Sequence, residues 1–365
     1  MVLFTMLRKV AIFFKLKKIL IALSGGVDSA CCAVLMKNEG YELLGATMRL
    51  HSKESSCLTE NDINDASELC KRLKIPYHVV DFSSDFDKYV IENFISAYEN
   101  GATPNPCIEC NFRLKFDKLF EFAMQNGCDY IATGHYARIE FDEKYGRRVL
   151  KKGVNEKKDQ SYVLWRLDRS KLEHTIFPLG GMASKDEARE LLSGLGISTI
   201  SSKKDSQDIC FVPDGDYATF IENYRKKSYP VGDFVDLKGN VLGKHKGIIR
   251  YTIGQRKGLG LALPAPMYVV SKDLIKNEVV LGFNEDLFAK ELYASEVNLT
   301  AIDRVDSPIR VKAKIRYNQE ARDATATMEN GLLHVVFDEP QRAICRGQSV
   351  VLYDGDTVLG GGIIC

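Results

Sequence analysis

The chain carries Ser24-Gly25-Gly26-Val27-Asp28-Ser29 between an apolar run and a helical pattern, and this stretch indicates how its first half folds. The continuously apolar residues 19–23 are typical of a strand buried on both faces. Glycines after such a strand let the backbone close around phosphate oxygens, and the next helix adds amide donors. No lysine stands where a Walker A loop needs one. We interpret the stretch as a different phosphate-binding loop, the alternative being a glycine turn with an Asp or Ser cap.

Strand and helix patterns alternate on both sides of this loop, up to about residue 137. We expect strands at residues 19–23, 43–48, 77–82 and 130–133, and helices around residues 30–35, 63–73, 86–98 and 112–124. This alternation predicts an α/β fold with a doubly wound parallel sheet. Ligands of such sheets bind outside the carboxyl ends of the strands.

The pattern changes after about residue 215, where short β-rich runs lie between glycine turns. These runs cover residues 234–236, 267–270, 311–317, 334–337 and 350–353. Spacing of this kind predicts one or two small barrels. We therefore expect an N-terminal extension (1–16), a nucleotide-binding catalytic domain (17–214), a small central β-rich domain (215–285) and a C-terminal β-barrel (286–365).

The composition narrows the function classes. Hydrophobic residues make up 45% and charged residues 27% of the 365 residues, as in folded soluble proteins. The 50 basic residues are balanced by 49 acidic residues, so nucleic acid would be bound by local patches only. Ten cysteines are too few for a disulfide scaffold, and no apolar run approaches the roughly 18 residues of a membrane helix. We expect a soluble protein of a reducing cytoplasm that binds no membrane.

Three cysteines have the setting of reactive thiols. Cys107 and Cys110 form a C-x-x-C just before the helix expected at residues 112–124, and a helix N-terminus makes a thiol more acidic. A structural metal site is the alternative, but it needs two further ligands at tight spacing and no second C-x-x-C exists. Cys210 follows the polar residues 203–208, which include Lys203 and Lys204, although a buried packing role is as common for such a cysteine. For Cys31, Cys32, Cys70 and Cys128 we expect packing roles.

Taken together, the motifs resemble the tRNA-specific 2-thiouridylase family, whose phosphate loop is the PP-loop of the ATP pyrophosphatases. The resemblance runs from about residue 17 to residue 364. Besides the loop, its motifs occupy residues 45–48, 103–106, 132–138, 158–162, 204–211, 251–260, 316–317, 347–349 and 359–363.

The resemblance implies ATP-dependent 2-thiolation of the wobble uridine of tRNA. ATP with Mg²⁺ would adenylate the C2 oxygen, and sulfur would come from a cysteine persulfide, which leaves a disulfide. Cys110 would be the nucleophile and Cys210 the persulfide carrier. The implied nucleotide contacts are Ala22, Leu23, Ser24, Gly25, Gly26, Val27, Asp28, Ser29, Met48 and Gly134. The implied tRNA contacts are Asn105, Pro106, Cys107, His135, Lys158, Asp159, Gln160, Arg316, Tyr317 and Gln348. The implied partners are the anticodon stem-loop of tRNA and a sulfur-donor protein, either a persulfide carrier or a cysteine desulfurase.

One position departs from the family pattern. Cys107 stands where the family has an aspartate near the target base. With Cys110 and Cys210 it makes a set of three thiolates, which suits a [4Fe–4S] cluster with one open iron holding hydrosulfide. The cluster route is therefore an alternative to the persulfide route. More distant alternatives are a PP-loop amidotransferase or ligase, which leaves Cys110 and Cys210 without a task, and a non-catalytic RNA-binding module.

Basic residues of the β-rich half form a candidate surface for the RNA backbone. Lys244, His245, Lys246, Arg250, Arg256 and Lys257 precede or belong to the motif at residues 251–260. Lys312, Lys314 and Arg316 alternate along the strand expected at residues 311–317, so we expect them on one side of it. The alternative is a solvated charged face.

Overall fold

The sheet of the first domain is parallel, as predicted. The computed structural model describes residues 16–50, 59–194, 200 and 209–365. In its sheet the order is β3-β2-β1-β4-β7, and all neighbouring strands are parallel. The strands are β1 (Lys18–Ala22), β2 (Glu42–Arg49), β3 (Tyr77–Asp81), β4 (Tyr130–Ala132) and β7 (Thr175–Ile176).

Strand β1 lies at the centre of this sheet and is buried on both faces. Ile19, Leu20 and Ile21 are fully buried. Because successive side chains of a strand point to opposite faces, Ile19 and Ile21 enter one core cluster and Leu20 enters another. The continuous apolar run is thus explained by helices on both sides of the sheet.

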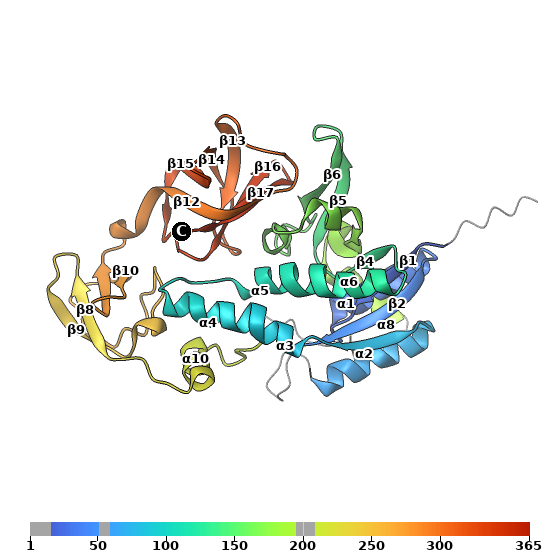
Figure 1. Ribbon diagram of the computed structural model, residues 1–365, viewed down its shortest axis with the longest axis horizontal. Coiled ribbons are helices and arrows are strands. Elements are labelled where there is room, and N and C mark those ends of the chain that lie inside the picture. Colours follow the sequence, from blue (N-terminus) through green and yellow to red (C-terminus); the bar gives the residue numbers. More distant parts are fainter. Residues whose placement is uncertain (1–15, 51–58, 195–199, 201–208) are drawn as a thin grey trace, which may run out of the picture.

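Those helices form two layers (Figure 1). The core with Ile19 and Ile21 is shared by α1 (Val27–Asn38), α2 (Glu60–Leu73) and α8 (Lys185–Gly194). The core with Leu20 is shared by a continuous helical stretch made of α5 (Pro106–Glu109), the π-helical η2 (Cys110–Lys118) and α6 (Leu119–Gln125). Next to this stretch runs α3 (Ser83–Phe86), η1 (Asp87–Ile91) and α4 (Glu92–Glu99). Shorter elements are η3 (Ser161–Leu164), α7 (Arg169–Glu173) and η4 (Pro178–Gly181).

The central domain is a small sheet that packs on the first domain. Its strands are ordered β10-β11-β8-β9, with β8 (Gly232–Asp236), β9 (Val241–His245), β10 (Tyr268–Asp273) and β11 (Glu278–Gly282). It also contains the single turns η5 (Ile248–Arg250) and η6 (Glu285–Leu287), and the preceding helix α10 (Tyr217–Arg225) was not predicted. Phe234 and Val269 share one core with Phe86 and Phe211. The central domain is therefore not separated by a linker but continuous with the core beneath α3 and α4.

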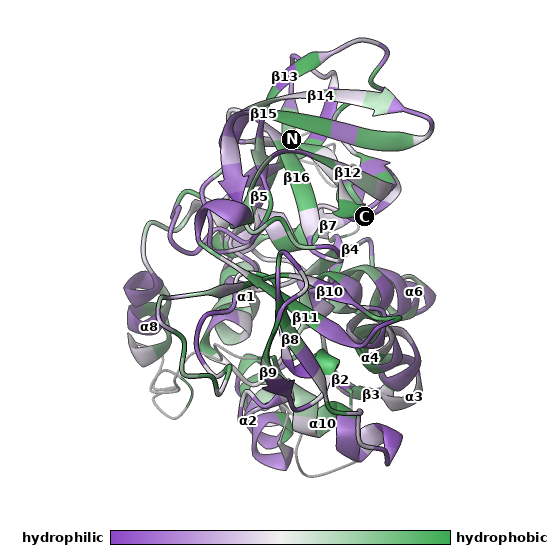
Figure 2. Ribbon diagram, turned by 90° about the vertical axis from the view of Figure 1, so that its left-hand side faces the viewer, coloured by the Kyte–Doolittle hydropathy of each residue, from purple (hydrophilic) through white to green (hydrophobic). Residues whose placement is uncertain are grey.

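The C-terminal domain is a closed barrel, as predicted. Its strands follow the order β12-β15-β14-β13-β16-β17, and pairing between β12 and β17 closes it. They are β12 (Phe288–Leu299), β13 (Ile309–Lys314), β14 (Arg322–Glu329), β15 (Leu332–Arg342), β16 (Ser349–Asp354) and β17 (Thr357–Ile364). Strand β15 alternates between half-buried and buried residues over residues 332–337 and becomes exposed and hydrophilic after them, whereas β16 is mainly hydrophobic (Figure 2). Strand β16 is buried on both faces because Val351 and Tyr353 pack into the core with Leu20.

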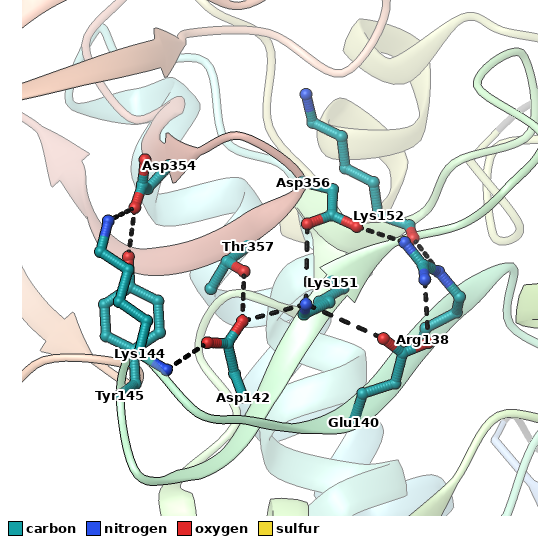
Figure 3. A network of polar contacts seen from close by, with 10 residues as sticks. All are labelled: Arg138, Glu140, Asp142, Lys144, Tyr145, Lys151, Lys152, Asp354, Asp356 and Thr357. Atoms are coloured by element: carbon teal, nitrogen blue, oxygen red, sulfur yellow. Dashed lines mark hydrogen bonds and ion pairs between the residues drawn. The ribbon is translucent and has the colours of Figure 1, made fainter.

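A hairpin of the first domain extends the barrel sheet. It consists of β5 (Ala137–Asp142) and β6 (Arg147–Lys152), and β6 pairs with β17 at Lys151 and Thr357. The Lys151 ammonium lies 3.0 Å from Asp142 and 3.8 Å from Asp356, and Arg138 also contacts Asp356 (Figure 3). Each exposed pair contributes little alone, but a network holds several charges in place. The network fixes the barrel against the loop after β4.

Two further observations complete the fold. The strand expected at residues 311–317 ends at Lys314, so the predicted stripe is wrong for Arg316, which lies in the turn that follows β13. Lys312 is exposed and pairs with Asp323 at 3.3 Å, while Lys314 is half-buried. Among the described helices, none is long and apolar enough to cross a membrane.

Candidate active site

The phosphate loop lies where the strand order of the parallel sheet reverses. Strands β2 and β3 extend from β1 to one side, and β4 and β7 extend to the other. The loops that leave β1 and β4 therefore separate and open a crevice at the carboxyl ends of the strands. Residues 23–26 follow β1 here, and residues 133–136 follow β4.

The loop after β1 is held in shape by its own residues. The Ser24 amide donates to Ser29 Oγ at 3.1 Å, and Ser29 Oγ donates to the Gly26 carbonyl at 3.0 Å. Gly25 has φ +71°, and a Cβ there would lie 2.4 Å from the Asp62 carbonyl oxygen. Only glycine fits both constraints. The turn thus leads directly into the N-terminus of α1, where the free backbone amides can bind an anion.

Asp28 is anchored on the first turn of α1. Its carboxylate accepts a hydrogen bond from Tyr136 Oη at 3.0 Å and pairs with Lys185 Nζ at 2.8 Å. A Cβ at Gly134 would lie 2.7 Å from the backbone carbon of Asp28. Glycine is therefore required for the loop after β4 to approach α1 this closely. The Asp28 oxygens are the side-chain atoms here that could hold Mg²⁺.

A cavity of about 200 Å³ opens between these two loops. It brings together seven of the ten predicted nucleotide contacts: Ala22, Leu23, Ser24, Asp28, Ser29, Met48 and Gly134. The predicted tRNA contacts His135 and Gln160 also line it, as do Ala46, Lys115 and Thr133. The lining combines hydroxyls, a carboxylate and a lysine with the apolar Met48 and Ala46, which fits an adenine nucleotide with its Mg²⁺.

Three of the predicted tRNA contacts are buried, namely Pro106, His135 and Asp159. His135 is 8% exposed and its Nδ1 lies 2.6 Å from Thr133 Oγ1. Burial, with Lys115 nearby, lowers the pKa of His135 well below its usual value, so the ring is neutral. The buried Asp159 carboxylate accepts from the Gly153 amide at 3.1 Å and from Ser161 Oγ at 2.8 Å. In this structure His135 faces the nucleotide cavity, and Asp159 shapes the loop that carries Lys158.

The cysteine motif starts a helix. Asn105 Oδ1 accepts from the Cys107 amide at 3.1 Å, and Pro106 occupies the first turn. This is a capped N-terminus of the kind that lowers a nearby thiol pKa. Cys107 is exposed, whereas Cys110 is half-buried at the start of the π-helical η2.

Cys110 and Cys210 pack against one hydrophobic core, that of Phe86, Leu114 and Phe211. Cys107 is exposed, and burial raises the pKa of the half-buried Tyr317, to which Cys107 adds a smaller electrostatic contribution. Within the described residues, no three Cys, His, Asp or Glu side chains gather as a metal site. The structure thus packs Cys110 and Cys210 against one core and leaves Cys107 on the surface. The predicted motif residues 203–208 lie outside the described residues.

Glu109 lies between the two motif cysteines and is tied to the barrel. Its carboxylate pairs with Arg166, whose Nη2 lies 2.8 Å from Glu296 of β12. Arg166 is 8% exposed and its guanidinium lies 4.3 Å from the Phe112 ring centroid. Burial raises the pKa of Glu109, although Arg166 and Arg113 oppose this. The network links the cysteine helix rigidly to the barrel.

The remaining predicted tRNA contacts meet at the junction of the three domains. Gln348 Nε2 donates to the Thr103 carbonyl at 2.7 Å, which fixes the loop before Asn105 to the barrel. Arg316 donates to the Ala343 carbonyl at 2.8 Å and the Ile253 carbonyl at 3.4 Å. Both side chains therefore hold the domains together next to the cysteine motif.

The structure adds three residues that the sequence did not indicate. Lys115 lines the cavity, and Lys185 and Tyr136 hold Asp28. Tyr136 lies within the quoted motif at residues 132–138, so that motif was the available signal. Lys185 is 157 positions from Asp28, and nothing local connects the two.

Family profiles match nearly all of the chain. The profile described as tRNA methyl transferase HUP domain matches residues 17–214. The profiles described as tRNA methyl transferase PRC-barrel domain and aminomethyltransferase beta-barrel domain match residues 218–283 and 289–364. These spans coincide with the parallel-sheet part, the central sheet and the barrel.

Curated relatives align along almost their whole length. The tRNA-specific 2-thiouridylase MnmA of Clostridioides difficile is 49% identical over 358 residues, which cover 96% of this chain and 99% of the relative. That of Acetivibrio thermocellus is 47% identical over 357 residues, covering 95% and 99%. Among solved structures, the U34-tRNA thiolase NcsA from Methanococcus maripaludis with its [4Fe-4S] cluster covers 57% of this chain and 67% of its own, at 20% identity and a TM-score of 0.34. So low a score carries nothing over to this chain.

Proposed function

The chain belongs to the tRNA-specific 2-thiouridylase family, and we propose that it thiolates the wobble uridine of tRNA with ATP and a cysteine persulfide. It is a transferase that forms 2-thiouridine in tRNA, and as a PP-loop protein it uses ATP with Mg²⁺. The profile names that mention methyl transfer do not change this, because a PP-loop and paired cysteines suit adenylation and sulfur transfer.

One observation carries the proposal. A single helical stretch, residues 106–125, presents Cys110 near its start and Lys115 to the nucleotide cavity one turn later. A uridine whose C2 oxygen is bonded to the α-phosphate therefore has its C2 carbon next to this helix. Placing the nucleophile and the activated carbon side by side is the main requirement of a two-step substitution.

In the first step, the uridine C2 oxygen attacks the α-phosphorus of ATP and the bond to pyrophosphate breaks. The amides at the N-terminus of α1, with Ser24 and Ser29, are placed to bind the leaving pyrophosphate. Mg²⁺ would neutralise charge on the phosphates, and Asp28 is the side chain that would hold it. Lys185 and Tyr136 keep that carboxylate aimed at the cavity.

In the second step, the terminal sulfur of a Cys210 persulfide attacks C2 and AMP leaves with the former C2 oxygen. The Cys110 thiolate then attacks the inner sulfur, and the sulfur–sulfur bond breaks toward C2. The products are the thiocarbonyl and a Cys110–Cys210 disulfide, which a thiol reductant must reduce before the next turnover. A protein that carries a persulfide would reload Cys210. The shared core of Cys110 and Cys210 supports this route.

The cluster route would require Cys107, Cys110 and Cys210 to bind one [4Fe–4S] cluster. In the described residues the three thiols are not grouped as metal ligands, and Cys107 is exposed whereas Cys110 and Cys210 are half-buried. The residues as arranged do not fit a cluster, so we derive no step through one.

The test is tRNA-dependent release of AMP and pyrophosphate by the purified chain, with nucleoside analysis of the tRNA. We expect both products only with tRNA, and 2-thiouridine when a persulfide donor is added. Equal release without tRNA, or an aminated or unmodified nucleoside despite a loaded donor, would refute the proposal.

A further inference from the structure

Lys115 is a cation in the wall of the nucleotide cavity that the reaction described above does not use. It is half-buried in η2 and lines the same cavity as Ser24, Asp28 and Ser29. Its ammonium has no hydrogen bond or ion pair to any described residue. The ammonium of Lys185, by contrast, forms an ion pair with the Asp28 carboxylate at 2.8 Å. Of the two lysines, Lys115 is the one left to meet a ligand's charge.

The π-helical form of η2 orients Lys115. In a π-helix each amide bonds to the carbonyl five residues earlier, and the Leu119 amide donates to the Leu114 carbonyl in this way. Residues five apart are therefore stacked on one side, whereas in an α-helix they diverge by about 140°. Cys110 and Lys115 are five apart. The π-helix thus brings the positions of Cys110 and Lys115 closer together around the helix axis than an α-helix would.

Lys115 shares the cavity wall with His135 and acts on it electrostatically. Its charge contributes to lowering the pKa of His135, which follows β4 and is buried. His135 is held neutral and Asp28 is already paired, so neither competes for the ammonium. An anion entering the cavity would replace water around Lys115 without breaking an existing protein contact.

We propose that Lys115 binds the α-phosphate of the nucleotide and stabilises the charge that develops there during adenylation. The assignment rests on the proposed function for its chemistry. Pyrophosphate would be bound by the amides at the N-terminus of α1. The α-phosphate would lie nearer Cys110, because C2 is joined to it through one oxygen, and Lys115 is about one turn from Cys110 in the same helix.

The inference is tested by nucleotide binding to Lys115→Met, with Lys118→Met as a matched control on the same helix. Lys118 is 34% exposed and lies 3.9 Å from Glu121. We expect Lys115→Met to weaken AMP binding about tenfold or more while adenosine binding changes less than about twofold, because only AMP has an α-phosphate. Lys115→Arg should restore most of the AMP affinity. Lys118→Met should bind both like the wild type.

The second measurement is tRNA-dependent pyrophosphate release. Lys115→Met should lower kcat by about 10²-fold, the typical cost of removing one group that stabilises transition-state charge, with tRNA affinity unchanged. Unchanged AMP binding, or parallel loss of AMP and adenosine, would overturn the inference. Loss of tRNA affinity would overturn it too, since Lys115 would then contact RNA. The two proposals can fail separately. If the wild type released no pyrophosphate with tRNA, the proposed function would be wrong. If Lys115→Met still lost affinity for AMP but not for adenosine, the contact of Lys115 with the α-phosphate would remain supported.

Discussion

The carboxylate of Glu109 and the guanidinium of Arg166 form a buried ion pair directly behind the cysteine motif. Their side chains are 13% and 9% exposed, and Arg166 also reaches Glu296 of the barrel at 2.8 Å. Because Glu109 is one position from Cys110, the contacts of Arg166 connect the barrel at Glu296 to the turn that carries Cys110. The position of the barrel therefore affects the position of the cysteine motif.

Arg166→Ala should be strongly destabilising, because it leaves the buried Glu109 carboxylate without its partner. Breaking one side of a buried pair typically costs about 3–5 kcal/mol. Arg113→Ala is the control, because the Arg113 side chain is 44% exposed and its Nε lies 4.0 Å from Glu109, which is a long contact for an ion pair. This substitution should lower the unfolding free energy by less than about 1 kcal/mol. Urea unfolding of both variants measures the difference. Equal losses of unfolding free energy in the two variants would show that Arg166 is not the main partner of the Glu109 carboxylate.

We expect variants of the phosphate loop to lose pyrophosphate release but to keep their affinity for tRNA. Asp28→Ala or Ser24→Ala should abolish tRNA-dependent pyrophosphate release, because these groups act on ATP and its Mg²⁺. The dissociation constant for tRNA should stay within a few fold. Asp306→Ala, at an exposed carboxylate paired with Arg304, should change neither. Collapse of tRNA binding, with normal pyrophosphate release by the bound fraction, would contradict the assignment.

Much of this architecture was predictable, and the exceptions have physical reasons. The buried strand at residues 19–23 and the loop after it follow from an uninterrupted apolar run and paired glycines. The hairpin of β5 and β6 was missed because its charged residues are stabilised by pairing with β17 and by Asp356, which are distant in sequence. Arg316 was placed on a strand because the turn at residues 316–319 contains neither glycine nor proline.

The site was predictable to the extent that it is local in sequence. The cavity collects Ser24, Asp28 and Gly134, which lie within motifs. Lys115 was missed because its side of the helix depends on a π-helical turn, and apolar periodicity does not reveal one. Lys185 was missed because only the packing of α8 against α1 brings it to Asp28. The catalytic roles of the cysteines stay predictions.

RNA binding should distinguish an exposed lysine from a half-buried arginine that bonds to the backbone. Lys257 is exposed, so Lys257→Ala should weaken tRNA binding and lower the slope of log K against log salt by about 1. Arg316 instead donates to the carbonyls of Ala343 and Ile253. Arg316→Ala should therefore lower the unfolding free energy, which Lys257→Ala should not. Salt titrations with thermal unfolding measure both, and an unchanged slope for Lys257→Ala would assign that residue to a solvated face.

His334 predicts a pH dependence on the barrel surface. Burial alone would lower its pKa, but the Glu329 and Glu291 carboxylates, each 2.8 Å away, raise it above the usual value. A raised pKa means that the charged ring stabilises the fold fully below about pH 6.5, and that this contribution is lost as pH rises through the folded-state pKa. His334→Gln should therefore cost more stability at pH 5.5 than at pH 8.5. A difference that is larger at pH 8.5 would reverse the assignment.

Replacing Cys107 distinguishes the persulfide route from the cluster route. In the persulfide route Cys210 carries the sulfur and Cys110 releases it, so Cys107→Ala should keep substantial thiolation activity while Cys110→Ala and Cys210→Ala are inactive. In a cluster route all three thiolates are ligands, and each loss should remove iron and activity together. We propose the first route, in which Cys110 and Cys210, both packed against one core, carry out the transfer. Thiolation and iron content are measured after anaerobic reconstitution. An inactive, iron-depleted Cys107→Ala beside an active, iron-loaded parent would make Cys107 a ligand and end the persulfide-only account.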